Sequence, residues 1–170
     1  MYSTSTAEQI VAMPAQVAPQ RRWTHQRIGV RIALLLHPYV REQGLGELFV
    51  APLDVLLEPN LVLQPDLLVV PAGLLRKKSD VVGRLLLAVE VVSPGSARHD
   101  RVRKRPAYQR NRVPEYWVVD DPSQTVERWR PEDDRPELVA GRLEWRPEGA
   151  SEPFVLDLPA FFAEVLPAEE

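Results

Sequence analysis

The sequence predicts an α/β (α+β) fold in which a mixed central sheet is flanked by helices. Three observations favour it: a long early segment with apolar residues at helical spacing, apolar runs of strand length in the middle, and short β-rich segments near the end. The length of 170 residues is that of one ordinary domain, so we expect a single domain over residues 1–170.

The first part of the chain predicts an arm and a long helix. Residues 1–20 are small, polar and spaced by prolines, which is typical of an irregular segment. Residues 24–43 place apolar side chains at helical spacing, with Thr24 as the candidate N-cap and Gly44 as the candidate stop. Pro38 lies inside this run, so we expect the helix to kink or end near it.

The middle of the chain predicts the sheet. Residues 46–52 and 53–59 are short, β-rich and end in proline, which indicates a hairpin. Residues 63–70 predict a short buried strand. Residues 85–92 form a continuous apolar run, typical of the centre of a sheet that is covered on both faces.

Charged segments and strands alternate in the remainder. Residues 98–111 are charged and compatible with a helix, which Pro106 disturbs. Residues 115–120 predict another buried strand. Residues 121–170 predict a C-terminal β-meander of alternating strands, followed by a short terminal helix.

Composition excludes several classes of protein and of site. The chain has no cysteine, so it forms no disulfide, thiolate nucleophile or Cys-based zinc site. Its apolar runs are shorter than the ~20 residues that cross a bilayer, and the first residues do not resemble a secretory signal, so we expect a cytoplasmic protein. Phosphate-cradling glycine motifs and the nucleophile-elbow spacing are absent. Three tryptophans lie in predicted strands and are expected to pack there: Trp117, Trp129 and Trp145.

Charge is distributed unevenly along the chain. Residues 1–113 carry 16 Lys/Arg against 9 Asp/Glu, whereas residues 114–170 carry 5 against 15. Residues 98–112 hold seven Lys/Arg and one acid, Asp100. Such a basic segment is compatible with a local site for a polyanion, and a solvated helix face is the simpler alternative.

Two acids stand in otherwise apolar strands. Asp66 lies at the mouth of the 63–70 strand, and Glu90 lies near the end of the 85–92 run. An ionised carboxylate in such a run is unfavourable unless it is paired or binds a metal. Mg²⁺ or Mn²⁺ favours an oxygen-rich site of this kind. The alternative is that Glu90 pairs with an arginine and Asp66 caps a turn.

Three polar residues follow Glu90 at helical spacing. Asp100, Lys104 and Tyr108 are four residues apart, which places them on one face of a helix. Because this helix follows the Glu90 strand, Lys104 is expected near the end of that strand, where an ammonium can hold water or stabilise charge on a phosphoryl group. The alternative is a surface Asp100–Lys104 pair worth about 0.3 kcal/mol.

Together these motifs resemble one family. Pro65-Asp66, EVVSPGS at 90–96, the D-x-x-x-K-x-x-x-Y spacing at 100–108 and VPEYWVVD at 113–120 are similar to the Uma-type endonuclease family of the PD-(D/E)XK superfamily. The likeness runs from about residue 25 to residue 120, and the combination of EVVSP with the later lysine and VPEYW is its most specific part. It implies a restriction-endonuclease-like core of helix, three strands, helix and strand.

The resemblance also implies a metal site. Asp66 and Glu90 match the two metal-binding acids of the superfamily, and the main-chain carbonyl of Val91 is the implied third ligand. The lysine of the superfamily usually stands two residues after the second acid, where this chain has Val92. Lys104 matches members in which the lysine lies on the following helix. Asp66, Glu90 and Lys104 are thus the implied catalytic residues, with one or two Mg²⁺ (or Mn²⁺) ions as cofactor.

Supporting roles are implied for further residues. His25 matches a site-facing histidine of the first helix of the family, and a local cap or surface position is the alternative. Asp100 is a candidate for orienting Lys104, whereas Tyr108 is expected mainly to pack. The basic segment supplies candidate contacts to a nucleic-acid backbone: Arg98, Arg101, Arg103 and Arg105.

We therefore expect a metal-dependent endonuclease that hydrolyses phosphodiester bonds of DNA. Duplex cleavage by small nucleases generally needs two active sites, so a homodimer is expected. The alternative is a non-catalytic nucleic-acid-binding or regulatory module that retains the nuclease fold. A third hypothesis is a protein-interaction domain, which the net negative charge of the chain favours. An enzyme requires the two carboxylates to share a cation with Lys104 on the same side, whereas a pure binder requires only the basic face.

Overall fold

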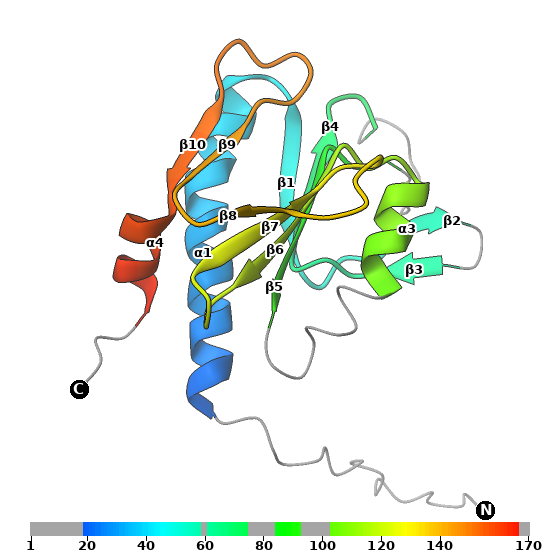
Figure 1. Cartoon of the computed structure of the whole chain (residues 1–170). Helices are drawn as coiled ribbons and strands as arrows, with labels where there is room; N and C mark the ends of the chain where they lie inside the picture. Colours follow the sequence, from blue (N-terminus) through cyan, green and yellow to red (C-terminus); the bar gives the residue numbers. More distant parts are fainter. Residues whose placement is uncertain (1–18, 59–60, 75–83, 93–102, 167–170) are drawn as a thin grey trace, which may run out of the picture.

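The computed structural model describes residues 19–58, 61–74, 84–92 and 103–166 (Figure 1). Its helices and strands are, in chain order, α1 (Pro19–Glu42), β1 (Gly46–Val50), β2 (Val55–Glu58), β3 (Leu61–Leu63), β4 (Leu67–Pro71), β5 (Leu87–Val92), α3 (Arg105–Arg110), β6 (Glu115–Asp120), β7 (Thr125–Trp129), β8 (Glu137–Val139), β9 (Arg142–Trp145), β10 (Phe154–Asp157) and α4 (Leu158–Val165). This mixed sheet with helices confirms the predicted fold class. None of the described helices is long and apolar enough to span a membrane.

Six strands form the central sheet in the order β1-β4-β5-β6-β7-β8. β5 and β6 are parallel, and every other neighbouring pair of this sheet is antiparallel. Two ribbons, β2–β3 and β9–β10, form separate small sheets. Because β4 and β5 are antiparallel, the start of β4 meets the end of β5 at one edge of the sheet.

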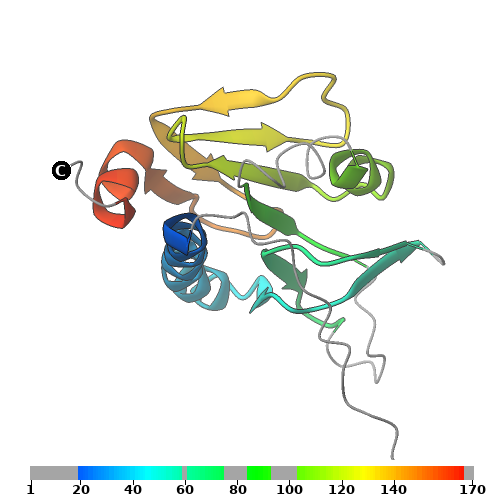
Figure 2. The same cartoon turned by 90° about the horizontal axis from the view of Figure 1, so that it is seen from below.

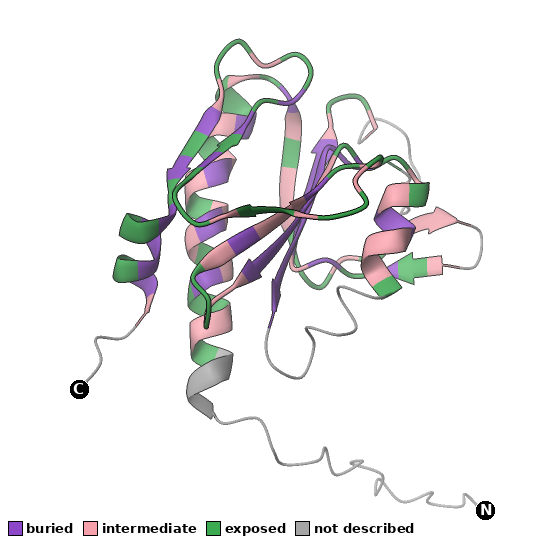
Figure 3. Ribbon diagram, viewed as in Figure 1, coloured by how far each residue is buried: buried purple, intermediate pink, exposed green. Residues whose placement is uncertain are grey.

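Both faces of the sheet are covered (Figure 2). α1, α4 and the β9–β10 ribbon pack on one face, and α3 and the β2–β3 ribbon pack on the other. All of β5 is buried, as Figure 3 shows. Side chains alternate along a strand, so Val89 and Val91 face α1, whereas Ala88, Glu90 and Val92 face α3. Burial on both faces explains the continuous apolar run that the sequence shows here.

α1 is longer than the sequence indicates. It begins at Pro19, so Thr24 lies inside the helix and is not its N-cap. The expected end of the N-terminal arm at residue 20 is therefore wrong by two residues, and residues 1–18 lie outside the described residues. Proline suits the first position of a helix because its fixed φ is already helical. The helix also continues through Pro38, because its buried apolar stripe extends on both sides and stabilises it against the loss of one hydrogen bond. Gly44 follows its end with φ +64°, as expected.

Strand pairing differs from the sequence prediction in two places. β1 pairs with β4 and β2 pairs with β3, so the predicted hairpin of residues 46–59 is wrong. Local sequence signals a turn without specifying which strands pair across the fold. In the C-terminal part, β6, β7 and β8 form the meander, whereas β9 leaves it and pairs with β10.

α3 covers only part of the expected 98–111 helix, and residues 93–102 lie outside the described residues.

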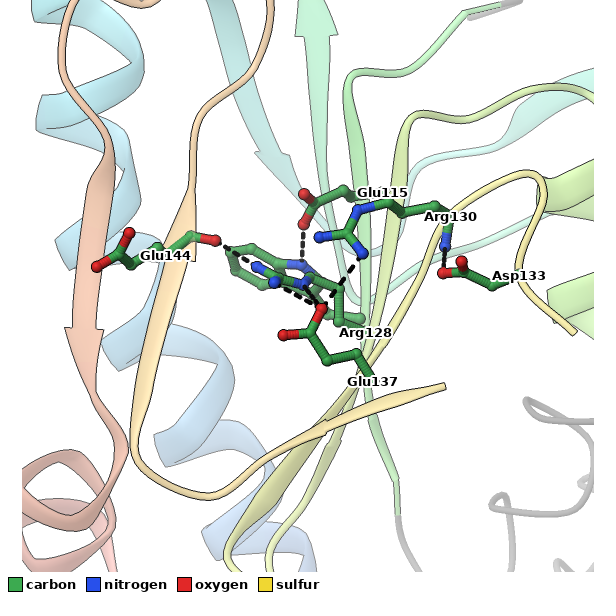
Figure 4. Close-up of polar contacts among 7 residues, drawn as sticks. Glu115, Arg128, Arg130, Asp133, Glu137 and Glu144 are labelled. Carbon is green, nitrogen blue, oxygen red and sulfur yellow. Dashed lines mark hydrogen bonds and ion pairs between the residues drawn. The ribbon is translucent and has the colours of Figure 1, made fainter. Parts of the chain in front are cut away.

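A network of ion pairs joins the last two strands of the central sheet (Figure 4). Glu137 is the cross-strand partner of Arg128, and its Oε2 accepts hydrogen bonds from Arg128 Nε and Nη2 at 3.1 and 2.7 Å and from Arg130 Nη1 at 3.2 Å. The hydrogen bond from Arg128 is the main cause that holds the pKa of Glu137 below its ordinary value. Burial raises the pKa of Glu115 nearby. The network fixes the edge strand β8 and is far along the sheet from β4.

Candidate active site

Asp66 lies where β4 begins and β5 ends. Continuing the antiparallel β4–β5 register places Pro65 opposite Val91. Pro65 has no N–H to offer the Val91 carbonyl, and the Val91 N–H donates instead to Asp66 Oδ2 at 2.8 Å. The Asp66 carboxylate therefore takes the place of the next hydrogen bond of the ladder and lies against the main chain beside Glu90.

α1 brings His25 to the same carboxylate oxygen. His25 Nε2 lies 3.1 Å from Asp66 Oδ2 and donates to it. The hydrogen bond to Asp66 outweighs burial and raises the pKa of the His25 imidazole, and the Asp66 charge and the Val91 carbonyl contribute to the rise. Within the described ranges, no hydrogen bond or ion pair falls on Asp66 Oδ1. Two donors thus fix one oxygen of the carboxylate.

Glu90 is the acid that β5 buries. Its exposed fraction is 2%, and no other charged residue of the described part of the chain is buried. Glu90 Oε1 accepts hydrogen bonds from Lys104 Nζ at 2.8 Å and from the Tyr108 hydroxyl at 3.3 Å. A buried carboxylate is strongly unfavourable without such partners. The ammonium of Lys104 therefore provides the buried Glu90 side chain with a partner of opposite charge.

The spacing of Lys104 and Tyr108 lets both reach one oxygen. Lys104 is the N-cap residue of α3 and Tyr108 lies one turn later, so their side chains share a face. Tyr108 is fully buried, and its ring centroid lies 4.7 Å from that of Tyr116. It packs, as expected, and in addition it donates to Glu90. Lys104 Nζ also lies 3.4 Å from the main-chain carbonyl of Gln64, a contact that side-chain motifs cannot indicate.

The oxygen groups at this edge fit a divalent cation of the magnesium class. Asp66 and Glu90 contribute carboxylates, and Val91 contributes a main-chain carbonyl that lies near the His25 imidazole. Magnesium is usually held by one or two carboxylates together with water and substrate phosphates. Among the described residues, no group of three or more His, Cys, Asp or Glu is arranged to hold a metal. The donor set therefore suits a cation that water and phosphate oxygens complete, and not a closed site made of side chains.

The other predicted residues are only partly described. Arg98, Asp100 and Arg101 lie outside the described residues. Arg103 is exposed, whereas the Arg105 guanidinium lies 4.5 Å from the ring centroid of Trp129. The packing of Arg105 is not anticipated by the sequence, and its contact with a nucleic acid stays a prediction. The tryptophans expected to pack are all buried: Trp117, Trp129 and Trp145.

A cavity of about 490 Å³ opens beside Asp66. Its lining comes from α1, from β1 and from the start of β4, and most of its residues are apolar. The sequence gives no signal for this cavity, because its walls are separate segments that meet only when α1 packs on β1.

Two comparisons with known proteins agree with this fold. The model of the Uma2 family, described as "Putative restriction endonuclease", matches residues 8–161. A similar solved structure is the crystal structure titled as a "putative nuclease belonging to DUF820" from Anabaena variabilis ATCC 29413. It superposes with a TM-score of 0.70 at 18% sequence identity, over 84% of this chain and 82% of that chain. This likeness shows a shared fold. No curated protein matches the chain. Because the family model spans most of the sequence, the chain belongs to the Uma2 family of restriction-endonuclease-like proteins.

Proposed function

We propose that this chain is a metal-dependent endonuclease that hydrolyses phosphodiester bonds of DNA, with Mg²⁺ or Mn²⁺ as its cofactor. The observation that carries the proposal is the meeting of Asp66, Glu90 and Lys104 at one edge of the sheet. Asp66 contacts the main chain of Val91, the residue after Glu90, and Lys104 contacts Glu90 itself. A binding module would have no need for two acids at this point, since acids repel a phosphate backbone.

Asp66, Glu90 and the Val91 carbonyl are the residues that would hold the cation. When bound, a divalent cation lowers the pKa of water and neutralises charge on a phosphate. The Val91 N–H and His25 both contact Asp66 Oδ2, and they orient the carboxylate. His25 is thus a positioning residue that acts through Asp66.

Lys104 supplies the positive charge of the site. Its side chain is largely buried, and its ammonium is directed by Glu90 and the Gln64 carbonyl. An ammonium held in this way can position a water molecule or stabilise negative charge that develops on the phosphoryl oxygens. Tyr108 donates to the same oxygen of Glu90 and restrains that carboxylate.

The basic segment supports the choice of nucleic acid as substrate. Arg98, Arg101 and Arg103 precede α3 in the chain, close in sequence to Lys104. Contacts of arginines with phosphates give affinity without choice of sequence.

We propose that two copies act together when the substrate is a duplex, because each strand then needs its own site.

Cleavage of plasmid and of single-stranded DNA with Mg²⁺ or Mn²⁺ tests the function. We expect cleavage by the wild type that EDTA abolishes and that Glu90→Gln and Lys104→Met each reduce at least 100-fold. Asp133→Asn, which changes a carboxylate beyond β7, is the matched control and is expected to retain full activity. Binding of DNA that falls with salt, without cleavage under any metal, contradicts the proposal and supports the binding module.

A further inference from the structure

The cavity beside Asp66 differs in chemistry from the site it adjoins. Its walls include the apolar residues Val30, Leu34, Leu48 and Val50. Among the described residues that line it, only Asp66 is acidic, and none is a lysine or an arginine. A volume of about 490 Å³ is in the range of pockets that hold small organic groups. No lysine or arginine lines it, so it suits a neutral group and not a phosphate.

The cavity and the candidate site share two residues. His25 and Asp66 line the cavity, and the same two side chains make the 3.1 Å contact that orients the Asp66 carboxylate. The mouth of the cavity is therefore within reach of a nucleoside next to a phosphodiester that is bound at Asp66.

Two polar side chains lie among the apolar walls. Gln26 and His37 both line the cavity, and the structure gives neither a hydrogen-bond partner within the described residues. An amide and an imidazole each offer a donor and an acceptor, which are the groups that pair with the edge of a nucleobase. Apolar walls with a few polar groups are the usual composition of a pocket for a flat heterocycle.

We propose that this cavity receives the nucleobase next to the scissile phosphate, turned out of the base stack. The inference rests on the proposed function and adds a substrate class to it. A paired and stacked base cannot enter a cavity in the protein, and unstacking is least unfavourable in single-stranded or mismatched DNA. The substrate is therefore DNA with an unpaired nucleotide beside the bond that is cut.

A duplex that carries one unpaired nucleotide fixes the register of binding. Its binding, measured by fluorescence anisotropy with Ca²⁺ in place of Mg²⁺, tests the proposal without cleavage. One nucleotide at a time is replaced by an abasic residue. We expect one position at which the loss of the base weakens binding by the wild type about tenfold, since contacts to a base typically contribute ~1–3 kcal/mol. The fully paired duplex is expected to bind more weakly than the duplex with the unpaired nucleotide.

Two exposed valines on strands provide the protein variants. Val50 lines the cavity and is 53% exposed, so Val50→Trp is expected to fill the cavity without disturbing the core. Val155, on β10 and 41% exposed, lies outside the cavity and serves as the control in Val155→Trp. Val50→Trp should bind the intact duplex with the unpaired nucleotide about tenfold more weakly and lose its sensitivity to the abasic position. Val155→Trp should behave as the wild type.

The outcomes separate this inference from the function on which it rests. DNA binding with no sensitive abasic position, or with Val50→Trp equal to the wild type, overturns the nucleobase cavity and leaves the nuclease proposal intact. Absence of DNA binding by the wild type overturns both. A change of oligomeric state in Val50→Trp by size-exclusion chromatography, with DNA binding unchanged, assigns the cavity to a second copy of the chain and overturns the proposal.

Discussion

Lys104 Nζ lies 2.8 Å from Glu90 Oε1, so the residue that begins α3 holds a cation against a carboxylate buried in β5. A buried ion pair contributes little net stability when both partners are present. Removal of one partner leaves an uncompensated charge, which is strongly unfavourable. Stability measurements can therefore detect this pair independently of any activity.

Lys104→Met should lower the free energy of unfolding by about 3 kcal/mol, because the Glu90 charge then stays buried without its cation. The double variant Glu90→Gln/Lys104→Met should recover more than half of that loss, since it removes the charge as well. Urea denaturation in EDTA measures both values. A loss below about 0.5 kcal/mol for Lys104→Met, the size expected of an exposed pair, would contradict the buried pairing.

His25→Ala should raise the Mn²⁺ concentration needed for half-maximal cleavage by about 10- to 100-fold, because it removes one of two donors that orient Asp66. His25→Gln should restore part of the loss, since its amide N–H can donate to the same oxygen. A metal titration of cleavage rates checks both variants. If the alanine variant needs no more metal than the wild type, His25 does not act through Asp66.

Tyr108→Phe should reduce stability by about 1 kcal/mol, because the ring still packs on Tyr116 while the hydrogen bond to Glu90 is lost. Tyr108→Ala should cost about 3 kcal/mol or more, since it also removes the buried ring. Thermal and urea denaturation measure the difference. Equal losses in the two variants would show that the ring contributes no packing.

Glu137 should make stability depend on pH at the edge of the sheet. Its folded pKa is lowered, chiefly by the hydrogen bond from Arg128, so its contribution is present above its ordinary pKa and is lost as pH falls through the folded pKa. Wild type and Glu137→Gln should therefore differ most near neutral pH and converge in acid. Urea denaturation from pH 7 down to acid follows this convergence, and a gap that does not change with pH would rule out the ion-pair contribution.

A charged residue in an apolar run is the feature of the sequence that predicts the site. Glu90 stands in a run that is buried on both faces, and a carboxylate there needs a partner. The i,i+4 spacing of Lys104 and Tyr108 placed both on one face, and the structure brings both to Glu90 Oε1. The predicted catalytic and metal-binding roles of these residues stay predictions.

Features that depend on contacts between distant segments could not be predicted. The partner of β1 is β4, which local turn signals do not specify. The contact between Asp66 and the Val91 N–H depends on where the β4–β5 ladder stops, and the cavity depends on how α1 packs on β1. Gln64 contributes only a main-chain carbonyl to Lys104, so no side-chain pattern marks it.

Mn²⁺ binding followed by electron paramagnetic resonance tests the central claim most directly, because it requires neither DNA nor turnover. The account predicts that the wild type binds Mn²⁺, that Asp66→Asn and Glu90→Gln each weaken binding at least tenfold, and that Asp133→Asn binds as the wild type does. Binding that is equal in all four proteins, or no binding by the wild type, would contradict a metal site formed by Asp66 and Glu90.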